Sequence, residues 1–143
     1  MTSQLYEKIL IATDGTDQNK TAIEEGLRIG RECGSIVYAA YVKDTRRFDS
    51  APTDAMMRDP WVVIEKQAED ALAFVQTIAE GVHLETVILE GKPDTEIVRF
   101  AAEKEIDLIV IGTHAKRGFE RLLLGSVAEQ VIRAATCKIL IVK

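Results

Sequence analysis

Five short apolar runs, separated by segments of helical periodicity and by glycine turns, constrain the fold of this chain more than any other feature. The runs occupy residues 8–13, 36–42, 82–89, 107–111 and 138–142. The first is apolar throughout from Ile9 to Ala12, which is typical of a strand covered on both faces of its sheet. A helical stripe follows, with Ile23, Leu27 and Gly30 at spacings i, i+4 and i+7. Strands that alternate with helices predict a parallel sheet with crossover helices.

We therefore predict an α/β fold: a single doubly wound domain with a five-stranded parallel sheet and helices on both faces. A length of 143 residues fits one domain, residues 1–143. The run at 82–89 begins by alternating apolar and polar residues, which places it at an edge of the sheet. The run at 138–142 is an apolar strand at the end of the chain, and an unpaired edge of that kind invites pairing with a second copy.

Composition excludes several classes of partner. No apolar run approaches the roughly 20 residues of a membrane span. The net charge of −5 argues against a general nucleic-acid binder. Cys33 and Cys137 have neither metal-ligand nor redox spacing, so we expect two reduced packing residues in a cytoplasmic protein. With His83 and His114 as the two histidines, we expect no histidine-based metal site.

The segment at 43–60 differs from the rest of the chain. It is polar, contains two prolines and shows no clear period. We predict a long mobile loop there, with a short helical piece at about 54–57, that closes over a ligand. A long helix is expected after it, from about residue 61 to residue 80.

The most informative stretch runs from Gly112 to Ser126. It begins where the apolar run 107–111 stops and ends where a helical stripe starts. Gly112, Gly118 and Gly125 allow backbone N–H groups to approach an anion without a Cβ in the way. Gly125 and Ser126 stand at a helix N-terminus, which favours negative charge. Basic side chains lie between these points: Lys116, Arg117 and Arg121. Each glycine also fits a plain turn, and the serine also fits an N-cap.

The spacing of this stretch resembles the ATP-binding signature of the universal stress protein family. That signature is Gly, two residues, Gly, nine residues, Gly, then Ser or Thr. Gly112, Ala115, Gly125 and Ser126 stand at those places, with Ala115 where the family has Gly. Residues 11–16 and 91–93 carry the same resemblance. It implies strand order 3-2-1-4-5, binding of ATP, and a homodimer joined through an antiparallel contact of the last strand.

In that order the first and fourth strands are neighbours at the topological switch point, where ligands bind in open α/β sheets. Asp14 then faces Gly112. Its carboxylate could accept hydrogen bonds from ribose hydroxyls, or it could hold a divalent ion such as Mg²⁺ on the phosphates. The alternative is that Asp14 only forms a turn beside Gly15. By resemblance, backbone groups of Val42 contact adenine. His114 is expected to fix the loop by a hydrogen bond. The residues expected to bind the nucleotide are Ala12, Thr13, Asp14, Val42, Gly112, Thr113, His114, Ala115, Lys116, Arg117, Gly118, Gly125, Ser126 and Val127.

Three functions remain open at this point. The first is a nucleotide-sensing regulatory module in stress response, which we favour. The second is an enzyme: the Walker pattern Gly-x-x-x-x-Gly-Lys-Ser/Thr is absent and no catalytic residue is identified, which leaves slow ATP hydrolysis. The third is a dimeric stress-response module that binds no nucleotide, and Ala115 is the feature that favours it.

Overall fold

The computed structural model describes residues 5–46, 59–113 and 125–143. Strands and helices alternate along the chain, as the apolar runs predict. The elements are β1 (Lys8–Thr13), a 3-10 turn η1 (Asp17–Asn19), α1 (Lys20–Cys33), β2 (Ile36–Lys43), α2 (Pro60–Ile78), β3 (His83–Glu90), α3 (Pro93–Glu103), β4 (Leu108–Gly112), α4 (Ser126–Ala134) and β5 (Lys138–Val142).

The strands form a five-stranded sheet in the order β3-β2-β1-β4-β5, and all four neighbouring pairs are parallel. The predicted fold class and strand order are therefore confirmed. Because β1 is flanked by β2 on one side and β4 on the other, the winding direction reverses between β1 and β4. That reversal creates a crevice at the carboxyl ends of these strands.

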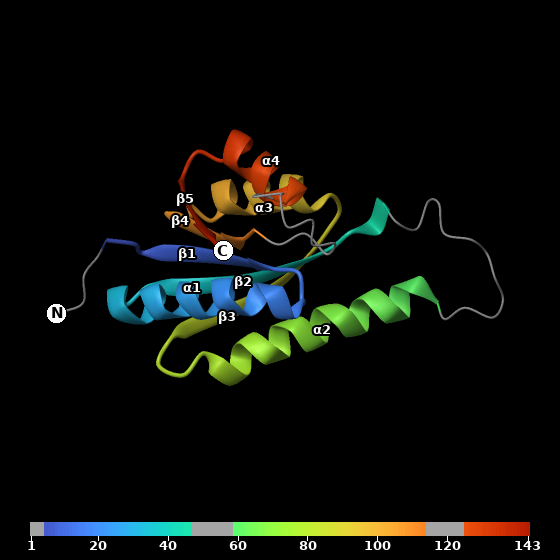
Figure 1. Cartoon of the computed structure of the whole chain (residues 1–143), viewed down its shortest axis with the longest axis horizontal. Helices are drawn as coiled ribbons and strands as arrows, with labels where there is room; N and C mark the ends of the chain where they lie inside the picture. The colour runs from blue at the N-terminus through green and yellow to red at the C-terminus, as the bar shows by residue number, and fades with distance from the viewer. Residues whose placement is uncertain (1–4, 47–58, 114–124) are drawn as a thin grey trace.

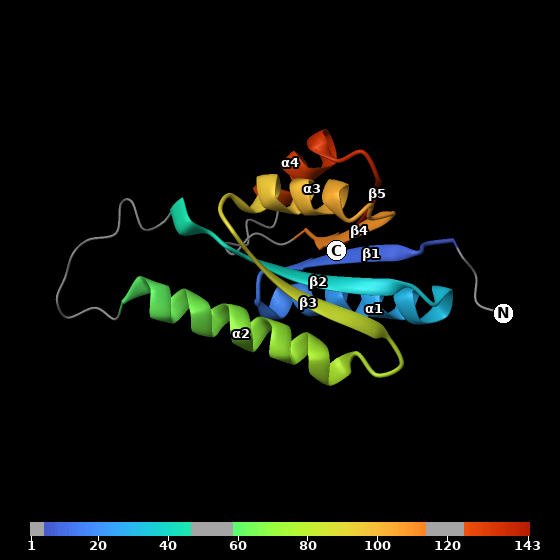
Figure 2. The same ribbon diagram turned by 180° about the vertical axis from the view of Figure 1, so that it is seen from behind.

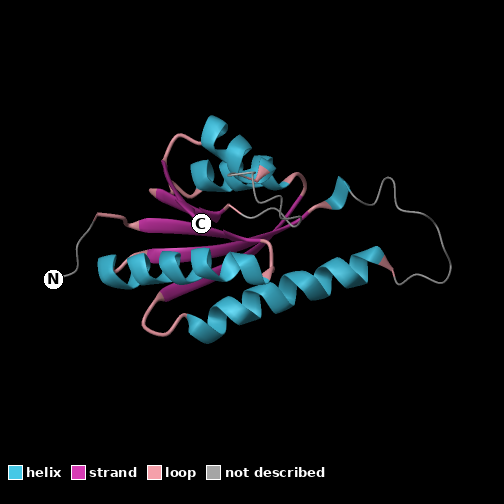
Figure 3. Cartoon of the chain, in the orientation of Figure 1, coloured by secondary structure: helices cyan, strands magenta, loops and turns pink. Residues whose placement is uncertain are grey.

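The helices cover the sheet in two layers. Helices α1 and α2 lie on one face and α3 and α4 on the other, as the views from both sides show (Figures 1 and 2). The strands lie between these layers when the chain is coloured by secondary structure (Figure 3). The described residues contain no helix that is both long and apolar enough to cross a membrane.

Side chains of the central strands alternate between two hydrophobic cores. Ile9 and Ile11 of β1 enter the core under α1 and α2, whereas Leu10 and Ala12 enter the core under α3 and α4. Residues Ile9, Leu10 and Ile11 are each 0% exposed, as expected of a strand covered on both faces.

Two glycines let α1 lie close to the sheet. A Cβ on Gly30 would overlap Cγ2 of Val37, and one on Gly26 would lie 2.7 Å from Cδ1 of Ile11. Both contacts are shorter than packed carbon atoms allow, so an added side chain would force α1 or the contacted side chain to move. The helix ends at Cys33, and the residue that caps it, Gly34, has a left-handed conformation with φ 69°.

The two edge strands differ in burial. Strand β3 stands at the end of the strand order and has only exposed and half-buried residues, which confirms its predicted edge position. Along β5, Ile139 to Val142 are half-buried, and the strand pairs only with β4 among the described strands.

The predicted loop at 43–60 is shorter in the structure at both described ends. Lys43 belongs to β2 and Pro60 is the first residue of α2. The third and fourth strands each begin and end one residue later than predicted. The interior of the loop, with the helical piece expected at 54–57, lies outside the described residues.

Candidate functional site

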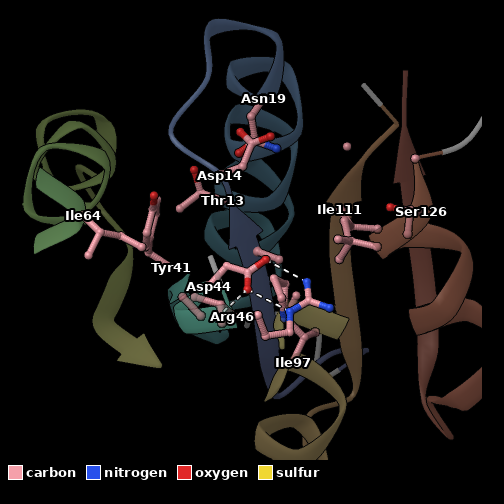
Figure 4. A pocket seen from close by; sticks show the side chains of 18 residues that line it. Thr13, Asp14, Asn19, Tyr41, Asp44, Arg46, Ile64, Ile97, Ile111 and Ser126 are labelled. Atoms are coloured by element: carbon pink, nitrogen blue, oxygen red, sulfur yellow. Dashed lines mark hydrogen bonds and ion pairs between the residues drawn. The ribbon is translucent and has the colours of Figure 1, made fainter. Parts of the chain in front are cut away.

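A cavity of about 370 Å³ opens at the carboxyl ends of β1, β2 and β4, at the point where the winding direction reverses. Its walls come from both helical layers and from the sheet edge between them (Figure 4). The lining residues are Ala12, Thr13, Asp14, Asn19, Ala40, Tyr41, Val42, Asp44, Arg46, Ile64, Pro93, Ile97, Ile111, Gly112, Gly125, Ser126, Val127 and Ala128.

Small side chains on neighbouring strands shape the apolar part of the cavity. Ala12 of β1 lies opposite Ala40 of β2 in the strand register, and both belong to the core under α3 and α4. Ile97 of α3 and Ile111 of β4, which are 3% and 6% exposed, close the wall around them. A floor of alanine methyl groups beside branched side chains leaves room for a flat apolar ring.

The N-terminus of α4 forms another wall. Gly125 is the N-cap, with φ −70° and ψ 158°, and no side chain among the described residues caps it. The first intrahelical bond is donated by the Glu129 N–H to the Gly125 carbonyl at 3.0 Å. The N–H groups of Ser126, Val127 and Ala128 precede that bond, and all three residues line the cavity. Uncapped N–H groups and the helix dipole make this wall suited to an anion.

Asp14 forms a tight turn at the end of β1. Its Oδ1 accepts bonds from the N–H of Thr16 at 2.9 Å and from the Thr16 hydroxyl at 2.6 Å. Thr13 Oγ1 accepts from the Gly15 N–H at 3.2 Å, and Gly15 has φ +78°. Asp14 therefore does form the turn beside Gly15 that was given as its alternative role. Its half-buried carboxylate also lines the cavity, so the turn fixes an oxygen ligand at the cavity wall.

A charged pair lies where β2 leaves the sheet. Arg46 donates to both carboxylate oxygens of Asp44, from Nε at 2.8 Å and from Nη2 at 2.7 Å. The hydrogen bond to Asp44 raises the pKa of Arg46 above its ordinary value, so the guanidinium stays charged at any physiological pH. Figure 4 shows this pair on the side of the cavity next to Ile97.

A buried lysine fixes the start of α2 against the sheet. The Lys43 side chain is 8% exposed and forms ion pairs with Glu65 of α2 and with Glu90 of β3, the latter at 3.4 Å. The hydrogen bond to Glu65 raises the pKa of Lys43 above its ordinary value. Glu65 follows Ile64, which lines the cavity, so the pair holds that part of the wall in place.

Asn19 carries a buried polar atom without a partner. The residue is 7% exposed, and among the described residues its Oδ1 has no hydrogen-bond donor within reach. Leaving a buried carbonyl oxygen unpaired costs about 1–3 kcal/mol, and such groups are rare in folded proteins. The side chain does not cap α1 either, although asparagine before a helix commonly does so.

The structure brings many of the predicted binding residues together. Those that line the cavity are Ala12, Thr13, Asp14, Val42, Gly112, Gly125, Ser126 and Val127. Thr113 is buried, and its N–H donates to the Val142 carbonyl at 3.1 Å; it does not line the cavity. His114, Ala115, Lys116, Arg117, Gly118 and Arg121 lie outside the described residues.

Sequence reasoning missed several lining residues. Asp44 and Arg46 directly follow β2, and the position of a strand end was the signal that could have found them. Asn19 gave no such signal, because its sequence position suggests only a helix cap. Among residues 5–46, 59–113 and 125–143, no group of three or more His, Cys, Asp or Glu residues is arranged to hold a metal ion.

The comparisons of the sequence with known proteins agree on one family. The sequence profile of the universal stress protein family matches residues 5–143. Universal stress protein MJ0531 of Methanocaldococcus jannaschii is 44% identical over 141 residues, which cover 97% of this chain and 83% of that protein.

Solved structures agree with the fold. The structure of protein MJ0577, from the same organism, superimposes with a TM-score of 0.83 at 27% identity, covering 97% of this chain and 96% of that one. A universal stress protein from Archaeoglobus fulgidus, solved in complex with dAMP, gives a TM-score of 0.65 at 24% identity over 97% of this chain and 99% of that one.

Proposed function

This chain belongs to the universal stress protein family, and from that premise we propose that it binds ATP in the cavity at the carboxyl ends of β1, β2 and β4. Its role is that of a nucleotide-sensing regulatory module in the stress response of the cytoplasm. A related structure that holds dAMP supports the choice of an adenine nucleotide.

One observation carries the proposal: a single cavity combines an apolar slot with an uncapped helix N-terminus. The slot beside Ala12 and Ala40 suits the flat, weakly polar adenine ring. The N–H groups at the start of α4 suit phosphate oxygens, because they supply donors and a positive dipole end without a competing cap. An apolar ring and an anionic chain on one ligand describe a nucleotide.

Basic residues that adjoin the cavity-lining residues in the sequence support a phosphate ligand. Arg46 lines the cavity together with Asp44, and this ion pair places N–H donors at the wall without net charge. Lys116, Arg117 and Arg121 follow β4 in the sequence and add three cations to the segment that leads into α4. Each such contact contributes little alone, but several act together on a polyphosphate.

Mg²⁺ would accompany the phosphates. It prefers oxygen ligands and keeps several waters, with one or two carboxylates and the phosphates of the substrate as partners. Asp14 fits this need, because the Thr16 bonds to its Oδ1 hold a half-buried carboxylate at the cavity wall. The ion would neutralise phosphate charge and fix the conformation of the triphosphate.

We also propose that two copies pair through β5. This strand stands at the edge of the sheet with a row of half-buried apolar residues from Ile139 to Val142. A second β5 in antiparallel orientation would satisfy its open backbone groups and cover that row. Light scattering at micromolar concentration should give twice the chain mass of 15.8 kDa, and a monomer would contradict the pairing.

Nucleotide carried through purification tests the binding proposal. The protein is purified without added nucleotide, denatured, and its supernatant is resolved by chromatography against adenine and guanine standards. An adenine nucleotide in a constant ratio to protein is the expected result. A supernatant without nucleotide, from protein that also binds none when ATP is added, would favour the dimeric module that binds no ligand.

A further inference from the structure

Asn19 reaches the cavity from the junction between η1 and α1. It ends η1 and directly precedes α1, and its backbone N–H donates to the Thr16 carbonyl at 3.1 Å. From there its side chain reaches the carboxyl ends of β1 and β4, where it lines the cavity beside Asp14 (Figure 4).

The neighbour of the Asn19 amide is a glycine. A Cβ on Gly112 would lie 3.1 Å from Nδ2 of Asn19, so the amide packs against the bare Cα at the end of β4. The residue is 7% exposed and its Oδ1 has no donor among the described residues. The Asn19 side chain thus packs against the end of β4, while its acceptor remains unpaired. A buried acceptor without a partner calls for an explanation, and a donor that arrives with a ligand supplies one.

We infer that Asn19 is a nucleotide-binding residue whose Oδ1 accepts a hydrogen bond from a ribose hydroxyl. The inference rests on the proposed function and names one further contact within the same cavity. A turn of the carboxamide about χ2, a torsion with broad preferences, brings Oδ1 to the cavity side.

The chemistry of the unpaired atom selects the ribose. A carbonyl oxygen needs a donor, and phosphate oxygens of ATP at neutral pH offer only acceptors. The adenine amino group would lie with its ring in the apolar slot beside Ala12 and Ala40, so we do not assign it to Asn19. The ribose joins the adenine ring to the phosphates, and Asn19 lines the same cavity as the apolar slot and the start of α4. A metal-bound water is another source of an O–H donor, and the experiment separates the two.

Asp14 is the other acceptor at this side of the cavity. Its Oδ1 already accepts two bonds from Thr16, which hold the carboxylate in its turn. Asn19 has no comparable bond to its Oδ1 among the described residues. A ribose hydroxyl would therefore give the Asn19 Oδ1 the partner that it lacks among the described residues.

The test compares ATP with 2′,3′-dideoxy-ATP, each with Mg²⁺, by calorimetric titration of the full chain. The wild type should bind ATP about tenfold more tightly than the dideoxy analogue, as the loss of one hydrogen bond in a closed site predicts. In Asn19→Leu, which has nearly the same shape but no acceptor, the ratio of the dissociation constants of the dideoxy analogue and ATP should fall to about one. Asn19→Asp keeps the acceptor oxygens, so it should keep the preference even though added charge weakens both ligands.

Stability of the unliganded protein provides a second readout. Asn19→Leu removes an unpaired acceptor, so its urea midpoint should equal or exceed that of the wild type. A lower midpoint would show that the amide has a structural partner and would overturn the inference. Asn19→Asp, which keeps the acceptor, is an independent check, since a lost preference for ATP over the dideoxy analogue in this variant would contradict the contact.

The outcomes separate the inference from the proposed function. If the wild type binds ATP and the dideoxy analogue equally, or if Asn19→Leu retains the tenfold preference, the ribose contact is wrong while ATP binding stands. If Asn19→Leu instead loses only the response to Mg²⁺, the donor is metal-bound water and the ribose contact is likewise overturned. If the wild type binds neither ligand, the proposed function itself fails.

Discussion

Gly112 at the end of β4 and Asn19 at the start of α1 are fitted to each other: a Cβ on the glycine would lie 3.1 Å from the amide nitrogen. The two residues are far apart in the sequence and meet because β4 pairs with β1 and α1 packs across both. Their contact closes one side of the cavity at the switch point of the sheet. It also connects the glycine stretch, recognised from its spacing, to a residue that the sequence did not point to.

Gly112→Ala tests that contact. The added methyl requires the Asn19 amide to move by a few tenths of an ångström, which a side-chain end can do without unfolding the domain. We expect ATP affinity to fall by about three- to tenfold, equivalent to roughly 0.7–1.4 kcal/mol, because Asn19 shifts within the cavity wall. Calorimetry measures the affinity, and urea unfolding checks that the fold is retained. Unchanged affinity would show that the amide position does not matter to the ligand.

Gly125→Val tests the phosphate wall. The glycine has φ −70° and ψ 158°, which valine adopts without strain, so the fold should survive. Its branched side chain would stand where phosphate approaches the N–H groups of Ser126 and Val127, and binding of ATP should fall below detection. Ala135→Val at the other end of α4, with φ −74° and ψ 147°, is the matched control and should bind normally. Equal affinity in both variants would place the phosphates elsewhere.

The buried Lys43 predicts a pH dependence of stability. Its pKa is raised in the folded state by the Glu65 hydrogen bond, so the stabilisation is complete below the unfolded value of 10.5 and is lost as pH rises through the folded pKa. Lys43→Met should lower the free energy of unfolding by about 1–2 kcal/mol at pH 7, since it leaves Glu65 and Glu90 without their cation. The gap between the wild type and this variant should narrow above pH 10.5 in urea titrations. A gap that is constant with pH would mean that packing, not charge, accounts for the loss.

Gly30→Ala tests the close approach of α1 to the sheet. Alanine favours helix by about 1 kcal/mol over glycine, yet its Cβ would overlap Cγ2 of the fully buried Val37. We expect a net loss of about 1–3 kcal/mol of unfolding free energy. The double variant Gly30→Ala with Val37→Ala removes the overlap, so its loss should be smaller than the sum of the single losses. Strict additivity would contradict a direct clash.

The sequence was sufficient for the architecture because the signals there are local. Periodicity and apolar runs predicted each strand to within one residue at either end, as well as the sheet order through the family resemblance. Lys43 was assigned to the loop because the segment that begins there is polar and shows no clear period. Its burial depends on Glu65 and Glu90, which arrive from other elements.

Only part of the cavity was predicted, because contacts between distant parts of the chain cannot be recognised from a local sequence pattern. Gly125 and Ser126 could be recognised because a glycine before a helix is a local pattern. Asn19 became visible only when the fold placed its amide on Gly112, since a buried atom without a partner cannot be read from neighbours in the sequence.

A calorimetric titration of the wild-type chain with ATP and Mg²⁺ tests the central claim most directly. The proposed cavity predicts one ATP per chain with a dissociation constant on the order of micromolar, and a rise of about 2.7 kcal/mol in the free energy of unfolding at a ligand concentration 100 times that constant. The same titration with GTP should give weaker binding, because the apolar slot was assigned to adenine. Absence of both binding heat and ATP-dependent stabilisation, in protein shown to be folded and free of carried nucleotide, would contradict the account.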